Sequence, residues 1–212
     1  MSENTGMNIA VIYGSARSAR HGIKAARFVI NQLEARGHKV SLVEPLAYPL
    51  PLLDKMYKEF EPGQAPQVMQ QIADILTAAD AFVIVSGEYN HGEPAGLKNL
   101  LDHFQKEYLY KPSAIVTYSA GPFGGVRALV TLRAILAELG TASIPSSFPI
   151  SGVMSAFEED GTPKDEAYNR RIGKFLDELE WYGNALRAAR CAASCEAVGP
   201  VQQAMCRGEG SK

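Results

Sequence analysis

The sequence has no long hydrophobic run and no strong excess of either charge. Its longest apolar stretches, such as 81–85 and 114–116, are far too short to cross a bilayer. With 21 basic and 23 acidic residues, the formal net charge is -2. This balance gives no reason to expect nucleic acid or an anionic membrane as the partner. Residues 1–6 are short and polar and do not resemble a targeting segment, so we expect a cytoplasmic protein without a membrane span.

Cysteine is also scarce. The chain has three cysteines, all late in the sequence, at positions 191, 195 and 206. An odd number of late cysteines predicts no disulfide framework and is most simply explained by a reducing compartment. No group of His, Cys and carboxylate residues has the spacing of metal ligands, so we predict no metal site.

Short apolar segments alternate with amphipathic ones, and 46% of the 212 residues are hydrophobic, enough for one large domain. The predicted strands are Asn8–Tyr13, Val40–Val43, Ala81–Ser86, Ser113–Ser119 and Thr141–Pro145. The predicted helices are a first one ending near Arg36, then Gln67–Ala79, Ala95–Leu109, Val126–Leu139 and Asp165–Arg190. Between them, Leu46–Pro66 carries four prolines and predicts an irregular crossover loop that helps to shape access to the site.

Strands that alternate with helices predict a three-layer, doubly wound α/β domain over residues 7–190. Five strands fit the flavodoxin-like order 2-1-3-4-5, in which ligands bind beyond the carboxyl ends of the strands. Three unusual loops follow predicted strands, and we expect them to lie at these carboxyl ends. Residues 191–212 lose the helical pattern, and we expect them to form a loosely ordered extension.

The first of these loops, residues 14–22, has the composition of a phosphate site. A helix N-terminus presents free N–H groups and partial positive charge. The hydroxyl groups of Ser15 and Ser18 and the guanidinium groups of Arg17 and Arg20 add donors for an anion. Neither GxxxxGK[ST] nor GxGxxG is present, which disfavours a nucleoside triphosphate or a dinucleotide as the ligand of this loop. The alternative is a solvated Ser/Arg-rich turn.

The other two loops suit a flat aromatic ligand. In residues 87–94, Tyr89 offers an aromatic face, while Asn90 and Gly92 favour a tight turn with backbone N–H groups pointing inward. Residues 119–125 are rich in glycine and allow close backbone approach to the ligand. Each loop alone is a weak signal, but all three follow strands of one predicted sheet.

In three segments the chain resembles the NADPH-dependent FMN reductase family, which includes quinone and azo-dye reductases. They are GSARSARHG at 14–22, EYNHGEPAGLKNLLD at 88–102 and SAGPFGGVRA at 119–128, and the resemblance spans about residues 7–186. The resemblance implies that one set surrounds the FMN phosphate: Ser15, Arg17, Arg20, His21 and Gly22. It also implies contacts with the isoalloxazine ring by Glu88, Tyr89, Asn90, Gly92, Ser119, Ala120 and Gly121. Family members commonly have proline where this chain has Gly87.

The resemblance implies an FMN-dependent oxidoreductase that moves hydride from NADPH or NADH to a small acceptor such as a quinone, an azo compound or free flavin. No protein acid, base or nucleophile is required for this chemistry, so we predict no catalytic side chain. Relatives form oligomers, which implies a homodimer or homotetramer. The alternative function is a non-enzymatic electron carrier of the flavodoxin type, which the near-neutral charge disfavours.

Three smaller questions remain open at this level. His21 is either a phosphate ligand or a capping residue of the first helix. His91 is either a turn residue, which is the commoner case, or a proton donor to a reduced quinone. Lys98 and Asp102 have i, i+4 spacing on the third helix, which favours an ordinary intrahelical ion pair over a contact between subunits.

Overall fold

The computed structural model describes residues 6–197 of the chain, which carry a single parallel sheet. Its strands lie in the order β2-β1-β3-β4-β5. They are β1 (Asn8–Tyr13), β2 (Lys39–Val43), β3 (Ala81–Gly87), β4 (Pro112–Tyr118) and β5 (Ala142–Ile150). All four strand pairings are parallel. The predicted flavodoxin-like α/β fold is confirmed.

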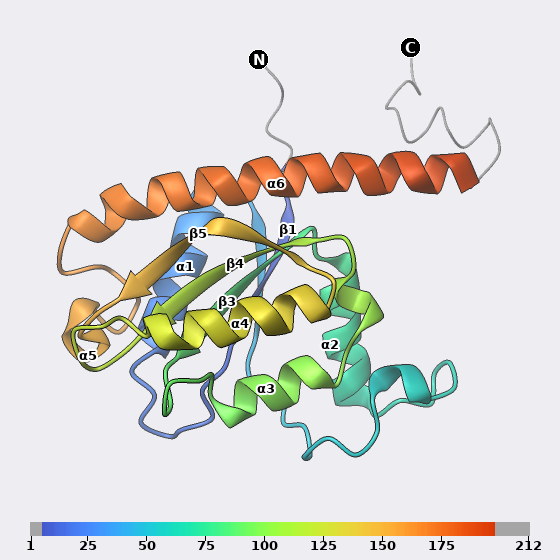
Figure 1. The fold of residues 1–212 in the computed structure, drawn as a ribbon, viewed down its shortest axis with the longest axis horizontal. Helices are drawn as coiled ribbons and strands as arrows, with labels where there is room; N and C mark the ends of the chain where they lie inside the picture. Colours follow the sequence, from blue (N-terminus) through green and yellow to red (C-terminus); the bar gives the residue numbers. More distant parts are fainter. Residues whose placement is uncertain (1–5, 198–212) are drawn as a thin grey trace, which may run out of the picture.

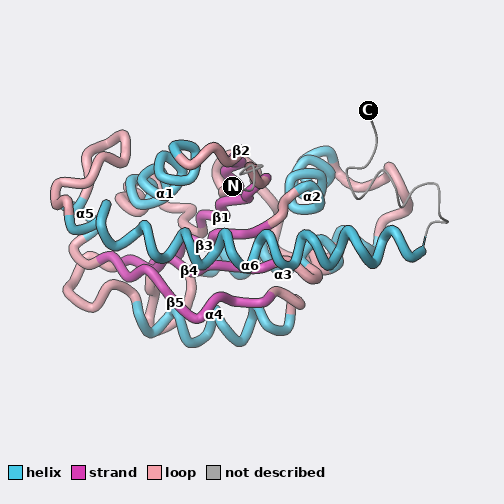
Figure 2. Tube along the Cα trace, turned by 90° about the horizontal axis from the view of Figure 1, so that it is seen from above, coloured by secondary structure: helices cyan, strands magenta, loops and turns pink. Residues whose placement is uncertain are grey.

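Helices cover both faces of the sheet (Figures 1 and 2). One face packs against α1 (Ile23–Ala35) and α6 (Ala167–Ala197), and the other against α2 (Gln67–Ala78), α3 (Ala95–Asp102) and α4 (Val126–Glu138). A four-residue helix, α5 (Val153–Ala156), follows the carboxyl end of β5. Two 3-10 turns complete the set, at Tyr57–Glu59 and Lys106–Tyr108.

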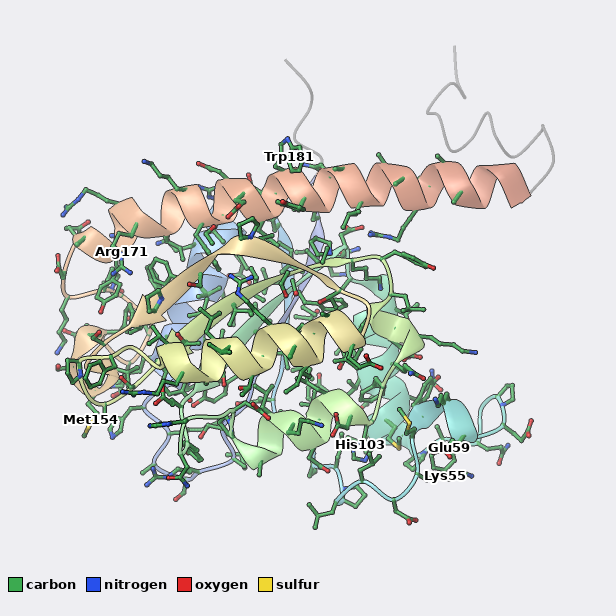
Figure 3. All side chains as sticks on the ribbon, viewed as in Figure 1. Lys55, Glu59, His103, Met154, Arg171 and Trp181 are labelled. Atoms are coloured by element: carbon green, nitrogen blue, oxygen red, sulfur yellow. The ribbon has the colours of Figure 1, made fainter. Side chains whose placement is uncertain are left out.

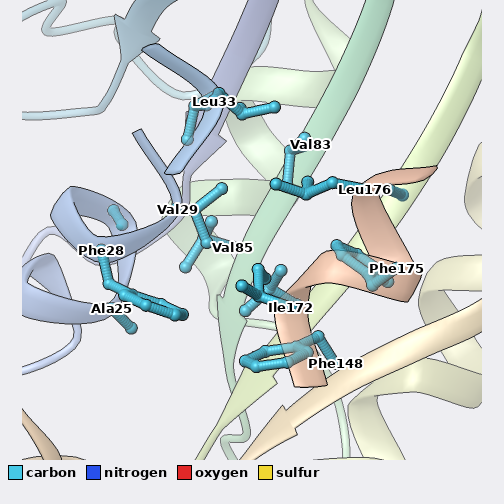
Figure 4. Close-up of a cluster of buried hydrophobic side chains, with 14 of the residues drawn as sticks. Ala25, Phe28, Val29, Leu33, Val83, Val85, Phe148, Ile172, Phe175 and Leu176 are labelled. Carbon is cyan, nitrogen blue, oxygen red and sulfur yellow. The ribbon is translucent and has the colours of Figure 1, made fainter. Parts of the chain in front are cut away.

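Strand β3 shows why the central strands are apolar throughout. All seven of its residues are buried, because alternate side chains enter different cores. Val83 and Val85 pack toward α1 and α6, where Figure 4 shows them beside Val29, Leu33 and Leu176. Phe82 and Ile84 face the opposite core, against α2, α3 and α4. The continuous apolar run is therefore the sequence signature of a strand covered on both sides.

Strand β5 is longer than predicted. It was expected at Thr141–Pro145 but runs over Ala142–Ile150, although Pro145 and Pro149 lie within it. Proline is tolerated there because β5 is one of the two edge strands and pairs only with β4 among the described residues. Arg133 donates hydrogen bonds to the carbonyl oxygens of Ile144 (3.1 Å) and Pro145 (2.6 Å), and Arg171 donates to that of Pro149 (3.2 Å).

Helix α3 is shorter than predicted, ending at Asp102 instead of Leu109. Phe104 and Tyr108 remain fully buried beyond its end. They keep the apolar spacing of a helix through the 3-10 turn, so the sequence pattern did not reveal the break. Within α3, Lys98 forms an ion pair with Asp102, which confirms the predicted intrahelical pair.

Helix α6 continues past Arg190, where the sequence predicted its end, to Ala197. Cys191 therefore lies on the helix and is exposed. The rest of the predicted loose extension, including Cys206, lies outside the described residues. Among residues 6–197, no helix combines the length and the hydrophobicity needed to span a bilayer.

Candidate functional site

A cavity of about 590 Å³ opens at the carboxyl ends of β1, β3 and β4. Its volume lies in the range typical of ligand pockets. The predicted site residues lining it are Ser15, Arg17, Arg20, His21, Gly22, Glu88, Tyr89, Asn90, Ser119 and Ala120. Gly92 and Gly121 lie outside the lining. The three loops expected from the sequence therefore converge on one cavity.

The first loop leads into the N-terminus of α1. Backbone N–H groups of residues 18–22 donate no hydrogen bond within the described part of the chain. Ser15 is buried, and its Oγ accepts a 3.4 Å hydrogen bond from the N–H of Arg17, whereas Arg17 itself is exposed. Free N–H groups, the positive end of α1 and an exposed guanidinium form an arrangement that suits a phosphate group.

Arg20 has a partner that the sequence did not predict. Its guanidinium forms a two-point ion pair with Glu44, including a hydrogen bond of 3.1 Å from Nη2 to Oε1. Glu44 follows directly after β2 and is 8% exposed. Arg20 also lies over the ring of Tyr13, with Cζ 5.7 Å from the ring centroid. Glu44 thus neutralises and fixes one of the two arginines of this loop.

The second loop is a tight hairpin. The N–H of Tyr89 donates to the Gly92 carbonyl (2.9 Å), and the N–H of Gly92 donates to the Tyr89 carbonyl (3.0 Å). Between them, Asn90 and His91 both have positive φ angles, of 51° and 70°, as a two-residue type I′ turn requires. His91 lies at the exposed tip and does not line the cavity. This placement favours its role as a turn residue.

Glu88 connects the second loop to α4. Its carboxylate accepts hydrogen bonds from the backbone N–H (3.0 Å) and the Nη1 group (3.1 Å) of Arg127. Burial raises the pKa of Glu88, but these hydrogen bonds and the charge of Arg127 outweigh it, so the pKa lies below its ordinary value of 4.5. Glu88 therefore stays negative and holds the start of α4 beside the cavity.

The third loop is tied to the segment after β5. The Ser119 hydroxyl donates to the Gly121 carbonyl (2.9 Å), which also accepts the N–H of Gly152 (3.1 Å). The N–H of Val153 donates in turn to the Ser119 carbonyl (3.1 Å). These bonds bring α5 to the cavity.

Sequence reasoning missed several lining residues. Tyr118 at the end of β4 and Val153 and Met154 on α5 all line the cavity. Met154 is 57% exposed and lies at the α5 end of the molecule (Figure 3). Tyr118 adjoins the matched segment 119–128, so its position at a strand end was the available signal. None of the residues that line this cavity comes from the crossover loop 46–66, and its predicted role in access stays a prediction.

A second cavity, of about 570 Å³, lies at the amino-terminal ends of β3 and β4. Asp80 and Lys111, which line it, directly precede β3 and β4. The Lys111 Nζ donates to the carbonyl oxygens of Leu76 (2.7 Å), Thr77 (2.9 Å) and Glu107 (3.0 Å). Ligands of doubly wound sheets bind at the carboxyl ends of the strands, so the cavity between the three loops is the candidate site.

The sequence profile of the family described as NADPH-dependent FMN reductase matches residues 7–154, which include all three loops. The chain belongs to the NADPH-dependent FMN reductase family. The predicted class, an NAD(P)H-dependent reductase, is therefore confirmed, together with FMN and NAD(P)H as the cofactor and co-substrate of the family.

Individual relatives agree with membership of the NADPH-dependent FMN reductase family. An NADPH azoreductase from Bacillus sp. (strain OY1-2) is 27% identical over 148 residues, covering 69% of this chain and 78% of the relative. A quinone reductase from Pseudomonas putida is 28% identical over 166 residues, covering 75% and 86%. Among solved structures, the flavoenzyme NAD(P)H:(acceptor) oxidoreductase FerB from Paracoccus denitrificans shares the fold. Its TM-score is 0.69 at 23% identity, with 84% of this chain and 98% of that chain covered.

Proposed function

We propose that this protein is an FMN-dependent oxidoreductase that passes hydride from NADPH through bound FMN to a small acceptor of the quinone, azo or free-flavin class. The observation that carries the proposal is the convergence of three strand-end loops on one cavity of about 590 Å³. When bound, FMN supplies the hydride chemistry, so the protein has to bind, orient and expose it.

The phosphate end of the site is proposed at the start of α1. Ser15, Arg17 and the free N–H groups of residues 18–22, that of Gly22 included, would hold the phosphate. His21, exposed and lining the cavity, would be a further phosphate ligand. Arg20 would contribute from its fixed position on Glu44.

The ring end is proposed between the second and third loops. Glu88, Tyr89 and Asn90 would contact the ring from one side, and Ser119 and Ala120 from the other. Gly92 and Gly121 would act indirectly, because their carbonyl oxygens accept the hydrogen bonds that shape the two loops.

The donor and the acceptor would enter through the exposed mouth of the cavity in turn. Tyr89, 41% exposed, and Met154, 57% exposed, offer apolar surface there, which suits flat acceptors. The need for reduced nicotinamide agrees with the expected cytoplasmic location.

We also propose a homodimer or homotetramer. Phe123, Val126 and Val130 are 61%, 40% and 70% exposed at the start of α4, close to the ring end of the site. Phe123 lies just before α4, and Val126 and Val130 are one turn apart on it. Exposed apolar side chains so close in the sequence favour a contact with a second copy.

Anaerobic mixing of the FMN-loaded protein with NADPH tests the proposal directly. We expect the flavin absorbance to bleach within seconds and to return when a quinone is added. Steady-state NADPH consumption with quinones, an azo dye and free FMN then ranks the acceptors. A protein that binds FMN but is reduced only by another reductase would be an electron carrier and would overturn the proposal.

A further inference from the structure

Tyr13 and Tyr118 meet across the middle strand at the phosphate end of the cavity. Tyr13 ends β1, Tyr118 ends β4, and β3 lies between them. Both rings point toward the α1 face of the sheet. Their centroids are 6.3 Å apart, with 27° between the ring planes, and their hydroxyl oxygens are 3.4 Å apart. Only Tyr118 lines the cavity.

Two glycines leave the space that the Tyr118 ring occupies. Gly87 pairs with Tyr118 in the sheet, and a Cβ atom at this position would lie 3.0 Å from Cε2 of the ring. A Cβ atom on Gly22 would lie 2.1 Å from Cζ and 2.4 Å from the hydroxyl oxygen. Gly22 has φ -64°, which any residue adopts, so glycine is needed there for space. The Tyr118 hydroxyl therefore touches the first turn of α1.

Ser15 brings a third hydroxyl to this point. Burial raises the pKa of Tyr118 and of Tyr13, although hydrogen bonding to Ser15 lowers both in part. Both phenols therefore keep their protons at neutral pH. Among the described residues, no carbonyl or carboxylate oxygen accepts a hydrogen bond from any of the three hydroxyls. The Tyr118 hydroxyl donates to that of Tyr13 at 3.4 Å, but a hydroxyl hydrogen can also rotate toward a stronger acceptor outside the group.

We propose that Tyr118 is a further FMN-binding residue, whose hydroxyl donates a hydrogen bond to the phosphate and makes the site prefer FMN over riboflavin. This inference rests on the proposed function, because it assumes that flavin occupies this cavity. A charged phosphate oxygen beside α1 would be a stronger acceptor than the Tyr13 hydroxyl, so the Tyr118 hydroxyl would turn from Tyr13 to the phosphate. The absence of a side chain at Gly22 and at Gly87 would then serve to make room for the ring of Tyr118 rather than for the flavin.

The test is a fluorescence titration of apo-protein with FMN and with riboflavin, which lacks the phosphate. In Tyr118→Phe we expect the Kd for FMN to rise about tenfold, because one hydrogen bond to a charged group is lost. The Kd for riboflavin should stay within about twofold of wild type. Tyr13→Phe is the matched control: it removes the partner hydroxyl but no cavity-lining group, and should leave the ratio of the two Kd values unchanged.

Two outcomes would overturn the inference: an unchanged ratio in Tyr118→Phe, or an equal loss of affinity for both flavins, which would indicate a role of the ring alone. If Tyr118→Phe does not fold, Tyr118→Leu provides the same test, because it also removes the hydroxyl and adds no atom beside Gly22. The Kd for FMN should again rise relative to the Kd for riboflavin. Wild-type protein that binds FMN without oxidising NADPH would reject the proposed reductase and leave this inference intact.

Discussion

Glu88 and Arg127 are joined by two hydrogen bonds, of 3.0 and 3.1 Å, that connect the loop after β3 to the first turn of α4. The pair fixes the distance between two loops that border the candidate ring site. Glu88 loses its negative charge as the pH falls through its pKa, which lies below 4.5. The stabilising effect of the pair therefore depends on pH.

We expect Glu88→Gln to lower the free energy of unfolding by about 0.5 kcal/mol at pH 7, since it removes a negative charge from a helix N-terminus. A carboxylate with a lowered pKa stabilises the fold above its unfolded pKa, and the effect is lost as the pH falls through its folded pKa. Urea unfolding should therefore show a larger difference at pH 7 than at pH 3. Glu93→Gln is the control, because Glu93 accepts a bond only from the Thr131 hydroxyl.

Substitutions of the two arginines of the first loop should differ in their effects on FMN binding and on the stability of the fold. Arg20→Ala leaves Glu44 buried without its partner, so we expect a loss of about 1–3 kcal/mol in unfolding free energy. Arg17→Ala should leave stability unchanged and weaken FMN binding about tenfold, because Arg17 is exposed beside the cavity. Urea unfolding measures the change in stability, and FMN titration measures the change in affinity. Equal effects of the two substitutions on stability would contradict the prediction.

Lys111 should make stability rise at alkaline pH. Burial, assisted by the charge of Arg190, lowers its pKa from 10.5 to about 8. Between these two values the unfolded chain binds more protons than the folded one, so the contribution of Lys111 to stability grows as the pH rises. We expect wild type to gain stability relative to Lys111→Met between pH 8 and 10.5, as measured by urea unfolding. A constant difference over that range would show that the lysine titrates normally.

Met154 should affect the acceptor and not the cofactor. It lines the exposed mouth of the cavity from α5, so Met154→Ala removes apolar contact area there. We expect kcat/KM for an apolar quinone to fall about threefold to tenfold, with FMN affinity unchanged. Trp181→Ala, on the outer side of α6 and 67% exposed, is the control and should change neither value. A matching loss of FMN affinity would place Met154 against the flavin itself.

The sequence predicted the fold well because the strongest patterns belong to buried strands. Strands β1, β3 and β4 are continuous apolar runs, and each was located to within about one residue. Strand β5 was cut short because its prolines resemble a loop unless its edge position is known. Helix α3 was extended too far because Phe104 and Tyr108 keep helical spacing after the helix has ended.

The sequence predicted the three loops of the site. It did not predict the contacts that join these loops to other parts of the chain. Glu44 follows β2, far from Arg20 in the sequence, and only the adjacency of β1 and β2 brings the two together. Tyr118 reaches the first loop across β3, and α5 arrives through backbone bonds to Ser119 and Gly121. Such contacts depend on strand order and on loop conformation, which local spacing does not encode.

The composition of β5 also limits how copies of this protein can assemble. Positions 145 and 149 offer no N–H group, and the carbonyl oxygens of residues 144, 145 and 149 are already bound by arginine side chains. A neighbouring chain therefore finds no continuous ladder along β5, which disfavours growth of the sheet through this strand. The same arrangement protects the folded protein from polymerising along β5.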